Sequence, residues 1–278
     1  MTIIALTSAA GSPGVSSSVI GLALAWKRPC LVIEADPTGS SAMLTGYMRQ
    51  YAPNGITSVL DLEVAFRQTG KLPNLLELAT PVPNTNIRLL SGFRSHSQAR
   101  SKEQIWNNLL HQIQGLDTAG IDVLIDLGRL GLEGYATTLL EGANLGLMVL
   151  RSTLPAIVAA HSWASTLTQS TNTIATGPDV LGLLVIGEGH PYTADEITAE
   201  LKIPTLVKLP LDATTAEVFS LGAKPGRRFT RSPLYRSLPS AVAALTQHWQ
   251  QWQNTIAATP STPTTPFPMP QPMRGAQT

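Results

Sequence analysis

The sequence has little of what several protein classes require. It contains one cysteine, Cys30, in 278 residues, so an intrachain disulfide or a cysteine-based metal cluster is excluded. The histidines are scattered and show no metal-ligand spacing. Charged residues make up 13% of the chain and the net charge is +1. This excludes nucleic-acid binding that depends on a high positive charge of the whole protein. With so few cysteines, we expect a cytoplasmic protein.

Long apolar runs are also missing. No run approaches the roughly 20 apolar residues that a membrane-spanning helix needs, and residues 1–6 lack the pattern of a signal peptide. The chain is nevertheless 43% hydrophobic, which is too apolar for a mainly disordered protein. We therefore expect no transmembrane segment and one large domain, with or without a tail.

Short aliphatic runs alternate with helix-like segments along the chain. The expected strands are residues 3–6, 31–33, 87–90, 123–125, 145–150, 181–186 and 206–209, and the main expected helices are residues 17–26, 102–114, 132–141, 155–168, 194–201, 214–221 and 240–255. Continuous apolar strands alternating with helices predict an α/β fold, a doubly wound, mostly parallel sheet with helices on both faces. We expect residues 1–256 to form this domain.

The composition changes abruptly at the end of the chain. The last twenty residues, 259–278, contain six prolines and almost no aliphatic side chains. Such a segment buries too little apolar surface to offset the loss of chain entropy. We therefore expect residues 257–278 to be a disordered tail rich in proline and threonine.

The first strand is followed by a loop of small residues and the start of a helix, which is the context of a phosphate-binding loop. The candidate binding residues are Gly11, Ser12, Pro13, Gly14, Val15, Ser16, Ser17, Ser18 and Val19. Against the pattern G-x-x-x-x-G-K-[ST], Gly11 takes the first glycine and Ser18 the last hydroxyl. Backbone amides at a helix N-terminus can still hold an anion.

The charged residue of that pattern is missing, because its lysine is replaced by Ser17 and its second glycine by Ser16. A charge-assisted hydrogen bond contributes about 1.5–3 kcal/mol, so its loss weakens binding by about one to two orders of magnitude. The alternative interpretation is a serine-rich helix N-cap that binds no ligand.

Two carboxylates follow the ends of predicted strands. Asp36 lies just beyond residues 31–33, and Asp126 lies just beyond residues 123–125. Ligands of doubly wound sheets bind at the carboxyl ends of the strands. There Asp36 and Asp126 could hold Mg²⁺ through water or orient an attacking water. The alternative is that each aspartate only caps the turn that follows it.

At these residues the chain resembles the ParA/MinD family of deviant-Walker P-loop ATPases. The matching segments are residues 11–18, 36–40 and 122–128, and the order and spacing agree over about residues 2–256. The family's two loop lysines fall on Ser12 and Ser17. The resemblance implies a P-loop NTPase-like fold, ATP and Mg²⁺ as cofactors, and Ser18 and Asp126 at the metal. It also implies catalytic roles for Asp36 and Asp126.

The family positions cellular cargo through dimerisation controlled by ATP. The resemblance therefore implies a positioning or partitioning factor, and the missing lysines predict weak or absent hydrolysis. It also implies a homodimer or a heterodimer with a related ATPase. The alternative is an adaptor or scaffold that keeps the fold without binding nucleotide.

Two segments near the C-terminus suggest contact surfaces. Residues 224–236 carry five positive charges and no negative one. These cations, Lys224, Arg227, Arg228, Arg231 and Arg236, could contact DNA nonspecifically. The alternatives are a solvated loop or a cover over the nucleotide cleft. The helix at residues 240–255 is amphipathic but carries no lysine or arginine, so we expect it to pack on the sheet or on a partner instead of a membrane.

Overall fold

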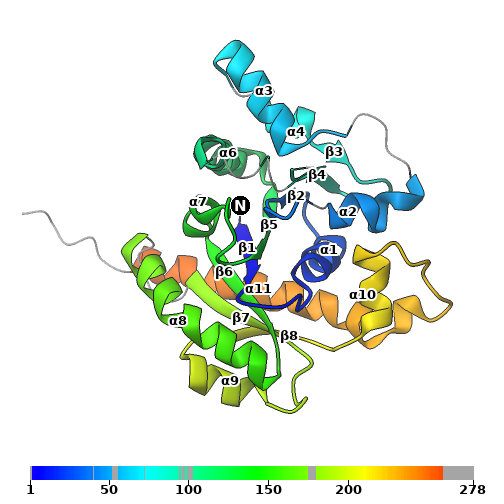
Figure 1. Ribbon diagram of the computed structural model, residues 1–278, viewed down its shortest axis with the longest axis vertical. Helices are drawn as coiled ribbons and strands as arrows, with labels where there is room; N and C mark the ends of the chain where they lie inside the picture. Colours follow the sequence, from blue (N-terminus) through cyan, green and yellow to red (C-terminus); the bar gives the residue numbers. More distant parts are fainter. Residues whose placement is uncertain are drawn as a thin grey trace, which may run out of the picture.

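The computed structural model describes residues 2–39, 41–51, 56–71, 73–93, 95, 98, 103–174 and 180–258. In this part of the chain, the strands form one sheet in the order β3-β4-β2-β5-β1-β6-β7-β8 (Figure 1). All neighbouring strands are parallel except β3, which is antiparallel to β4. The predicted α/β fold with a mostly parallel sheet is therefore confirmed.

The strands are β1 (Ile3–Ser8), β2 (Cys30–Glu34), β3 (Thr80–Pro81), β4 (Ile87–Leu90), β5 (Asp122–Arg129), β6 (Leu145–Arg151), β7 (Leu181–Ile186) and β8 (Thr205–Leu209). The helices are α1 (Val15–Ala25), α2 (Ala42–Thr45), α3 (Val59–Thr69), α4 (Leu75–Leu78), α6 (Glu103–Gly115), α7 (Thr137–Glu141), α8 (Leu154–Ile174), α9 (Ala194–Leu201), α10 (Ala213–Ser220) and α11 (Pro233–Ala258). Short 3₁₀ turns are η1 (Tyr47–Tyr51), η2 (Leu116–Ala119) and η4 (Phe229–Arg231).

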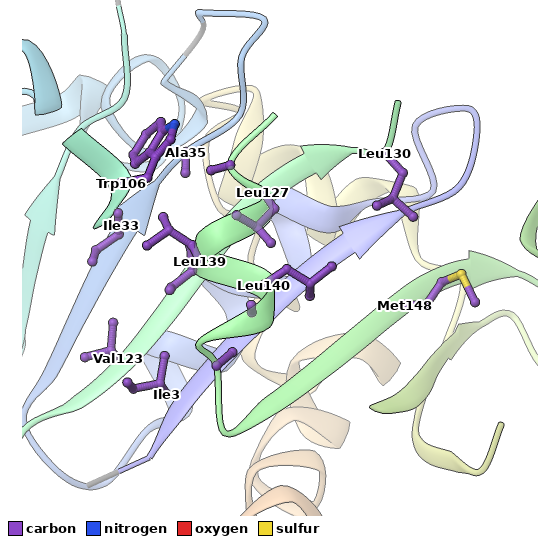
Figure 2. Close-up of a cluster of buried hydrophobic side chains, with 14 of the residues drawn as sticks. Ile3, Ile33, Ala35, Trp106, Val123, Leu127, Leu130, Leu139, Leu140 and Met148 are labelled. Carbon is purple, nitrogen blue, oxygen red and sulfur yellow. The ribbon is translucent and has the colours of Figure 1, made fainter. Parts of the chain in front are cut away.

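Each face of the sheet is covered by helices. Successive side chains of a strand point to opposite faces, so each strand contributes to the core on both sides. In β1, Ile3 and Ala5 join a core cluster with α3, α6, α7, α8 and α9, part of which Figure 2 shows. Ile4 and Leu6 join a second cluster with α1, α10 and α11. Burial on both faces explains why the strands are continuous apolar runs in the sequence.

The expected strands all lie where the sequence places them, but three helices differ from expectation. One of them, α8, was expected to end at residue 168 and continues to Ile174. The helix expected at residues 132–141 begins only at Thr137. The preceding residues form turns in which Gly131 and Gly134 have φ of 76° and 83°, which a right-handed helix does not allow.

The last helix begins earlier than expected. We expected it to begin after Pro239, but α11 spans Pro233–Ala258 with Pro239 inside it. Proline removes one helical hydrogen bond and disfavours the helix interior. Here Leu234, Leu238 and Leu245 are buried on both sides of the proline, and this continuous apolar face keeps the helix intact through it.

Helix α11 packs on the sheet as expected. It contacts β8, and its Trp249 is buried and stacks on Trp252 with ring centroids 4.7 Å apart. In the described part of the chain, no helix is long and apolar enough to cross a membrane. The predicted tail falls outside the described residues, apart from the last turn of α11, and stays a prediction.

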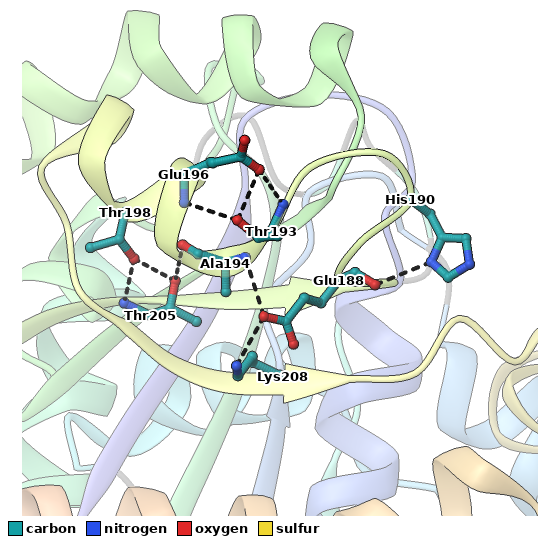
Figure 3. A network of polar contacts seen from close by, with 8 residues as sticks. All are labelled: Glu188, His190, Thr193, Ala194, Glu196, Thr198, Thr205 and Lys208. Atoms are coloured by element: carbon teal, nitrogen blue, oxygen red, sulfur yellow. Dashed lines mark hydrogen bonds and ion pairs between the residues drawn. The ribbon is translucent and has the colours of Figure 1, made fainter.

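Polar contacts fix the position of α9 at the end of the sheet (Figure 3). The Thr193 hydroxyl accepts from the Glu196 amide at 3.3 Å, and the Glu196 carboxylate accepts from the Thr193 amide at 2.8 Å. This capping box satisfies amide groups that a helix N-terminus leaves unpaired. The Lys208 ammonium on β8 lies 2.9 Å from the Glu188 carboxylate.

Candidate functional site

The loop between β1 and α1 has the backbone of a phosphate cradle. Gly14 is the N-cap of α1 with φ of 117°, and its carbonyl accepts from the Ser18 amide at 2.9 Å. Gly11 has φ of 68°, and a Cβ placed on it would meet no atom within 4 Å. Positive φ suits glycine and turns the loop back toward the helix. The loop therefore leaves open space beside its backbone.

A cleft of about 800 Å³ opens beside this loop at the carboxyl edge of the sheet. Every predicted residue from Gly11 to Ser18 lines it, and so does Asp36. Val19 does not, because its side chain is on the face of α1 that is buried in the core. The opposite wall comes from the end of β8 and from α10. The predicted loop residues other than Val19 thus share one cleft.

Asp36 and the end of β5 are brought together, as the sequence predicts. A Cβ on Gly128 would lie 2.3 Å from the Asp36 Cγ, so the glycine is what lets this carboxylate approach β5. The same carboxylate accepts from the Thr38 amide at 2.8 Å. Asp36 therefore caps the following turn and also faces the cleft.

Asp126 is 3% exposed and, unlike Asp36, does not line the cleft. Its Oδ1 accepts from the Gly128 amide at 3.0 Å. Burial raises the pKa of Asp126 to about 6, a hydrogen bond with the Ser16 side chain opposes the rise, and the negative charge of Asp36 adds to it. The side chain of Ser16, at the second glycine of the loop pattern, thus lies close to the carboxylate on β5.

A third carboxylate of this region, Glu34, was not among the predicted site residues. It pairs in register with Asp126, accepts from the Ser41 hydroxyl and accepts from the Met43 amide at 3.0 Å. Burial raises the pKa of Glu34 to about 7. Its partners at the start of α2 assign it a structural role beside the site.

Neither position expected to carry a lysine supplies a cation. Ser12 is exposed in the loop, and the Ser17 hydroxyl donates to the Ser220 hydroxyl of α10 at 2.8 Å. Two arginines that sequence reasoning missed, Arg129 and Arg151, line the cleft instead. Each is the last residue of an apolar strand, which is the signal that could have identified them.

The predicted basic segment lies elsewhere. Lys224, Arg227, Arg228, Arg231 and Arg236 are all exposed. They follow α10 and continue into the first turn of α11, and none of them lines the cleft. The geometry thus favours a solvent-facing segment over a cover for the cleft.

The residues present fit Mg²⁺ with a phosphate ligand. Ser18 and Asp36 line the cleft and offer oxygen atoms, the ligands that Mg²⁺ prefers, and the buried Asp126 lies behind this lining. Gly11 leaves room for an anion beside the loop. No group of three or more His, Cys, Asp or Glu able to hold a metal occurs among the described residues. A divalent ion here would therefore need oxygens of a bound phosphate, and it would neutralise phosphate charge.

Solved structures share this fold. A ParA family ATPase from Chlorobium tepidum matches with a TM-score of 0.65 and 14% identity, over 88% of this chain and 98% of that one. The septum site-determining protein MinD from Pyrococcus horikoshii, solved with Mg-ADP, matches with a TM-score of 0.65 and 15% identity, over 93% and 99%. The chain has the ParA/MinD fold.

A third structure extends the comparison to plasmid partition. A plasmid partition protein from Borrelia burgdorferi bound to AMPPNP matches the ParA/MinD fold of this chain with a TM-score of 0.61 and 14% identity, over 88% and 98%. No protein-family model matches the sequence, and no curated protein matches it significantly. The likeness therefore rests on the fold and confirms the predicted P-loop NTPase-like architecture.

Proposed function

We propose that this protein is a nucleotide-binding positioning or partitioning factor of the ParA/MinD kind, with weak or absent ATP hydrolysis. The observation that carries the proposal is the cleft that the loop from Gly11 to Ser18 shares with Asp36. Asp126, on the neighbouring strand β5, is buried. Loop amides, a helix N-terminus and adjacent carboxylates are the parts from which phosphate and Mg²⁺ sites are built. Similar structures were solved with Mg-ADP and AMPPNP.

Slow hydrolysis follows from the missing lysines. Charge on the transferred phosphoryl group must be stabilised in the transition state, and Ser12 and Ser17 provide no cation. Asp36 and Asp126 remain as the residues that would orient an attacking water, with Ser18 and Asp126 at the metal. The roles of these three residues are part of the proposal.

Two exposed leucines at the rim of the cleft are the basis for proposing that the protein dimerises. Leu211 and Leu221 line the cleft and are 54% and 68% exposed. Exposed large apolar side chains beside a binding site often mark a protein–protein contact. We propose that a second copy or a related ATPase covers this rim when nucleotide is bound, and that the cycle takes place in the cytoplasm.

The test is calorimetry of the purified protein with Mg-ATP, combined with sedimentation with and without nucleotide. We expect measurable binding, nucleotide-dependent dimers and turnover well below one per minute. Rapid turnover that Asp126→Asn abolishes would contradict the proposal of weak hydrolysis.

An adaptor that keeps the fold without nucleotide is the second candidate. One observation favours it: Ser17, at the lysine position of the pattern, is hydrogen-bonded within the protein to Ser220 of α10. This bond joins the start of α1 to α10 without a ligand. A wild-type protein that binds no nucleotide and shows the same mass with and without Mg-ATP would support the adaptor.

A further inference from the structure

We propose that Arg129 and Arg151 hold the phosphate chain of the bound nucleotide from two sides and supply positive charge for binding, without taking the positions of the loop lysines at the transferred phosphoryl group. This inference rests on the proposed nucleotide binding and assigns the charge that such binding requires. A triphosphate is polyanionic, and backbone amides alone give it no full positive charge.

The sheet topology places the two arginines on either side of the loop. Strand β1, which leads into the loop, has β5 as one neighbour and β6 as the other. Arg129 is the last residue of β5 and Arg151 the last residue of β6. The loop therefore lies between two strands that each end in an arginine.

Each arginine also lies next to one end of the loop. Arg129 pairs in register with Ser8, the last residue of β1 before the loop. Arg151 pairs with Ile186, whose Cδ1 lies 3.3 Å from where a Cβ on Gly14 would be. The first arginine thus flanks the start of the loop and the second flanks its junction with α1.

Both guanidinium groups are available to a ligand. Arg129 and Arg151 are exposed, and neither forms an ion pair with a carboxylate in the described part of the chain. Arginine can bind a phosphate group through two parallel N–H donors. It is therefore a better phosphate ligand than serine and at least as good a one as lysine.

The charge balance of the cleft strengthens the assignment. Among the described residues that line it, Arg129 and Arg151 are the only lysines or arginines, whereas Asp36, Asp212 and Glu217 are acidic. Asp212 accepts from the Thr215 hydroxyl at 2.7 Å as a helix cap. Without the two arginines, the described residues that line the cleft would carry only negative charge and would repel a polyphosphate.

The test compares Arg129→Gln, Arg151→Gln and the double variant with wild type, using Mg-ATP, Mg-ADP and adenosine as probes in calorimetry. The control is Arg227→Gln, which removes the same charge from an exposed arginine outside the cleft. We expect each single cleft variant to weaken Mg-ATP binding by about 10- to 100-fold, and the double variant by more. The cleft variants should bind adenosine with the affinity of wild type, and Arg227→Gln should bind all three probes as wild type does.

Charge-conserving variants separate a phosphate contact from a folding defect. Arg129→Lys and Arg151→Lys should recover part of the Mg-ATP affinity, and all variants should keep the wild-type melting temperature within a few degrees. Wild-type affinity in both glutamine variants would overturn the arginine assignment alone and leave the proposed function standing. No Mg-ATP binding by wild type would overturn both.

Discussion

The hydroxyl of Ser17 donates a hydrogen bond to the hydroxyl of Ser220 at 2.8 Å. This bond joins α1 to α10, two helices that also pack against each other. Ser17 stands where a phosphate-binding loop has its lysine. The residue type that would neutralise phosphate has therefore been replaced by one that ties two helices together.

Restoring the lysine is expected to strengthen nucleotide binding. Ser17→Lys places a cation beside the loop, and one charge-assisted hydrogen bond contributes about 1.5–3 kcal/mol. We expect Mg-ATP affinity to rise by about 10- to 100-fold in calorimetry.

Ser17→Ala is the matched control, because it also removes the bond to Ser220 but adds no charge. It should lower the free energy of unfolding by about 1 kcal/mol and leave Mg-ATP affinity close to that of wild type. An equal gain of affinity in both variants would show that release from Ser220, and not the charge, is responsible.

Gly128 is expected to be irreplaceable because of Asp36. Gly128→Ala would put a Cβ 2.3 Å from the Asp36 Cγ, so the carboxylate must move away from β5. We expect a loss of about 2–4 kcal/mol in the free energy of unfolding by urea, from overpacking and the positive φ together. The dependence of nucleotide binding on Mg²⁺ should weaken as well.

Gly11→Ala isolates the backbone contribution. Gly11 has φ of +68°, close to the +65° of Gly128, but a Cβ on it meets nothing within 4 Å. Gly11→Ala should therefore lower the free energy of unfolding by only about 1 kcal/mol. Similar losses in both alanine variants would show that crowding against Asp36 contributes nothing.

Stability is expected to fall as pH rises through the titration of Glu34. Burial raises the pKa of Glu34 from 4.5 to about 7, so the folded protein holds this proton more tightly than the unfolded chain. The resulting stabilisation is complete below about pH 4.5 and is lost as pH rises through about 7. Asp126 acts in the same direction over a lower range, up to about pH 6.

Urea midpoints measured from pH 4 to pH 8 check this expectation. Glu34→Gln should reduce the decline between about pH 6 and pH 8, because Asp126, with a pKa of about 6, contributes only to the lower part of that range. Glu77→Gln, at an exposed position, should keep the full decline. An unchanged decline in Glu34→Gln would assign the proton to another group.

DNA binding by the basic segment, residues 224–236, is expected to be weak and nonspecific. Association should fall steeply with salt, because each neutralised phosphate releases counterions. Replacing Arg227, Arg228 and Arg231 with alanine should flatten that dependence in an anisotropy titration and leave Mg-ATP affinity unchanged, since none of them lines the cleft.

The control for this segment removes three other cations, Lys27, Arg67 and Lys71, which are exposed away from it. Their replacement with alanine should leave the salt dependence as in wild type. Negligible DNA binding by wild type at low salt would eliminate the segment as a DNA contact.

Removal of residues 259–278 is expected to leave the fold intact. The segment has six prolines and few apolar side chains, so it has little surface to bury. The melting temperature of the chain ending at Ala258 should lie within about 2 °C of the full chain, because surface changes rarely exceed about 0.5 kcal/mol. A drop of many degrees would show that the tail packs on the domain.

The sequence by itself determined the sheet, the phosphate-type loop and the two aspartates. Strands buried on both faces are continuous apolar runs, and this local pattern survives in any tertiary context. The loop and Asp36 could be placed at the site because parallel strands bring their carboxyl ends to one edge of the sheet. These predictions needed only residue type and order along the chain.

Only the tertiary structure decided which charges face the loop. Arg129 and Arg151 are separated from it by more than a hundred residues, and only the order of β5, β1 and β6 in the sheet brings them beside it. The partner of Ser17, Ser220, is 203 residues away. Burial likewise sets the pKa of Glu34 and Asp126, because desolvation depends on what packs around a carboxylate and not on its neighbours in the chain.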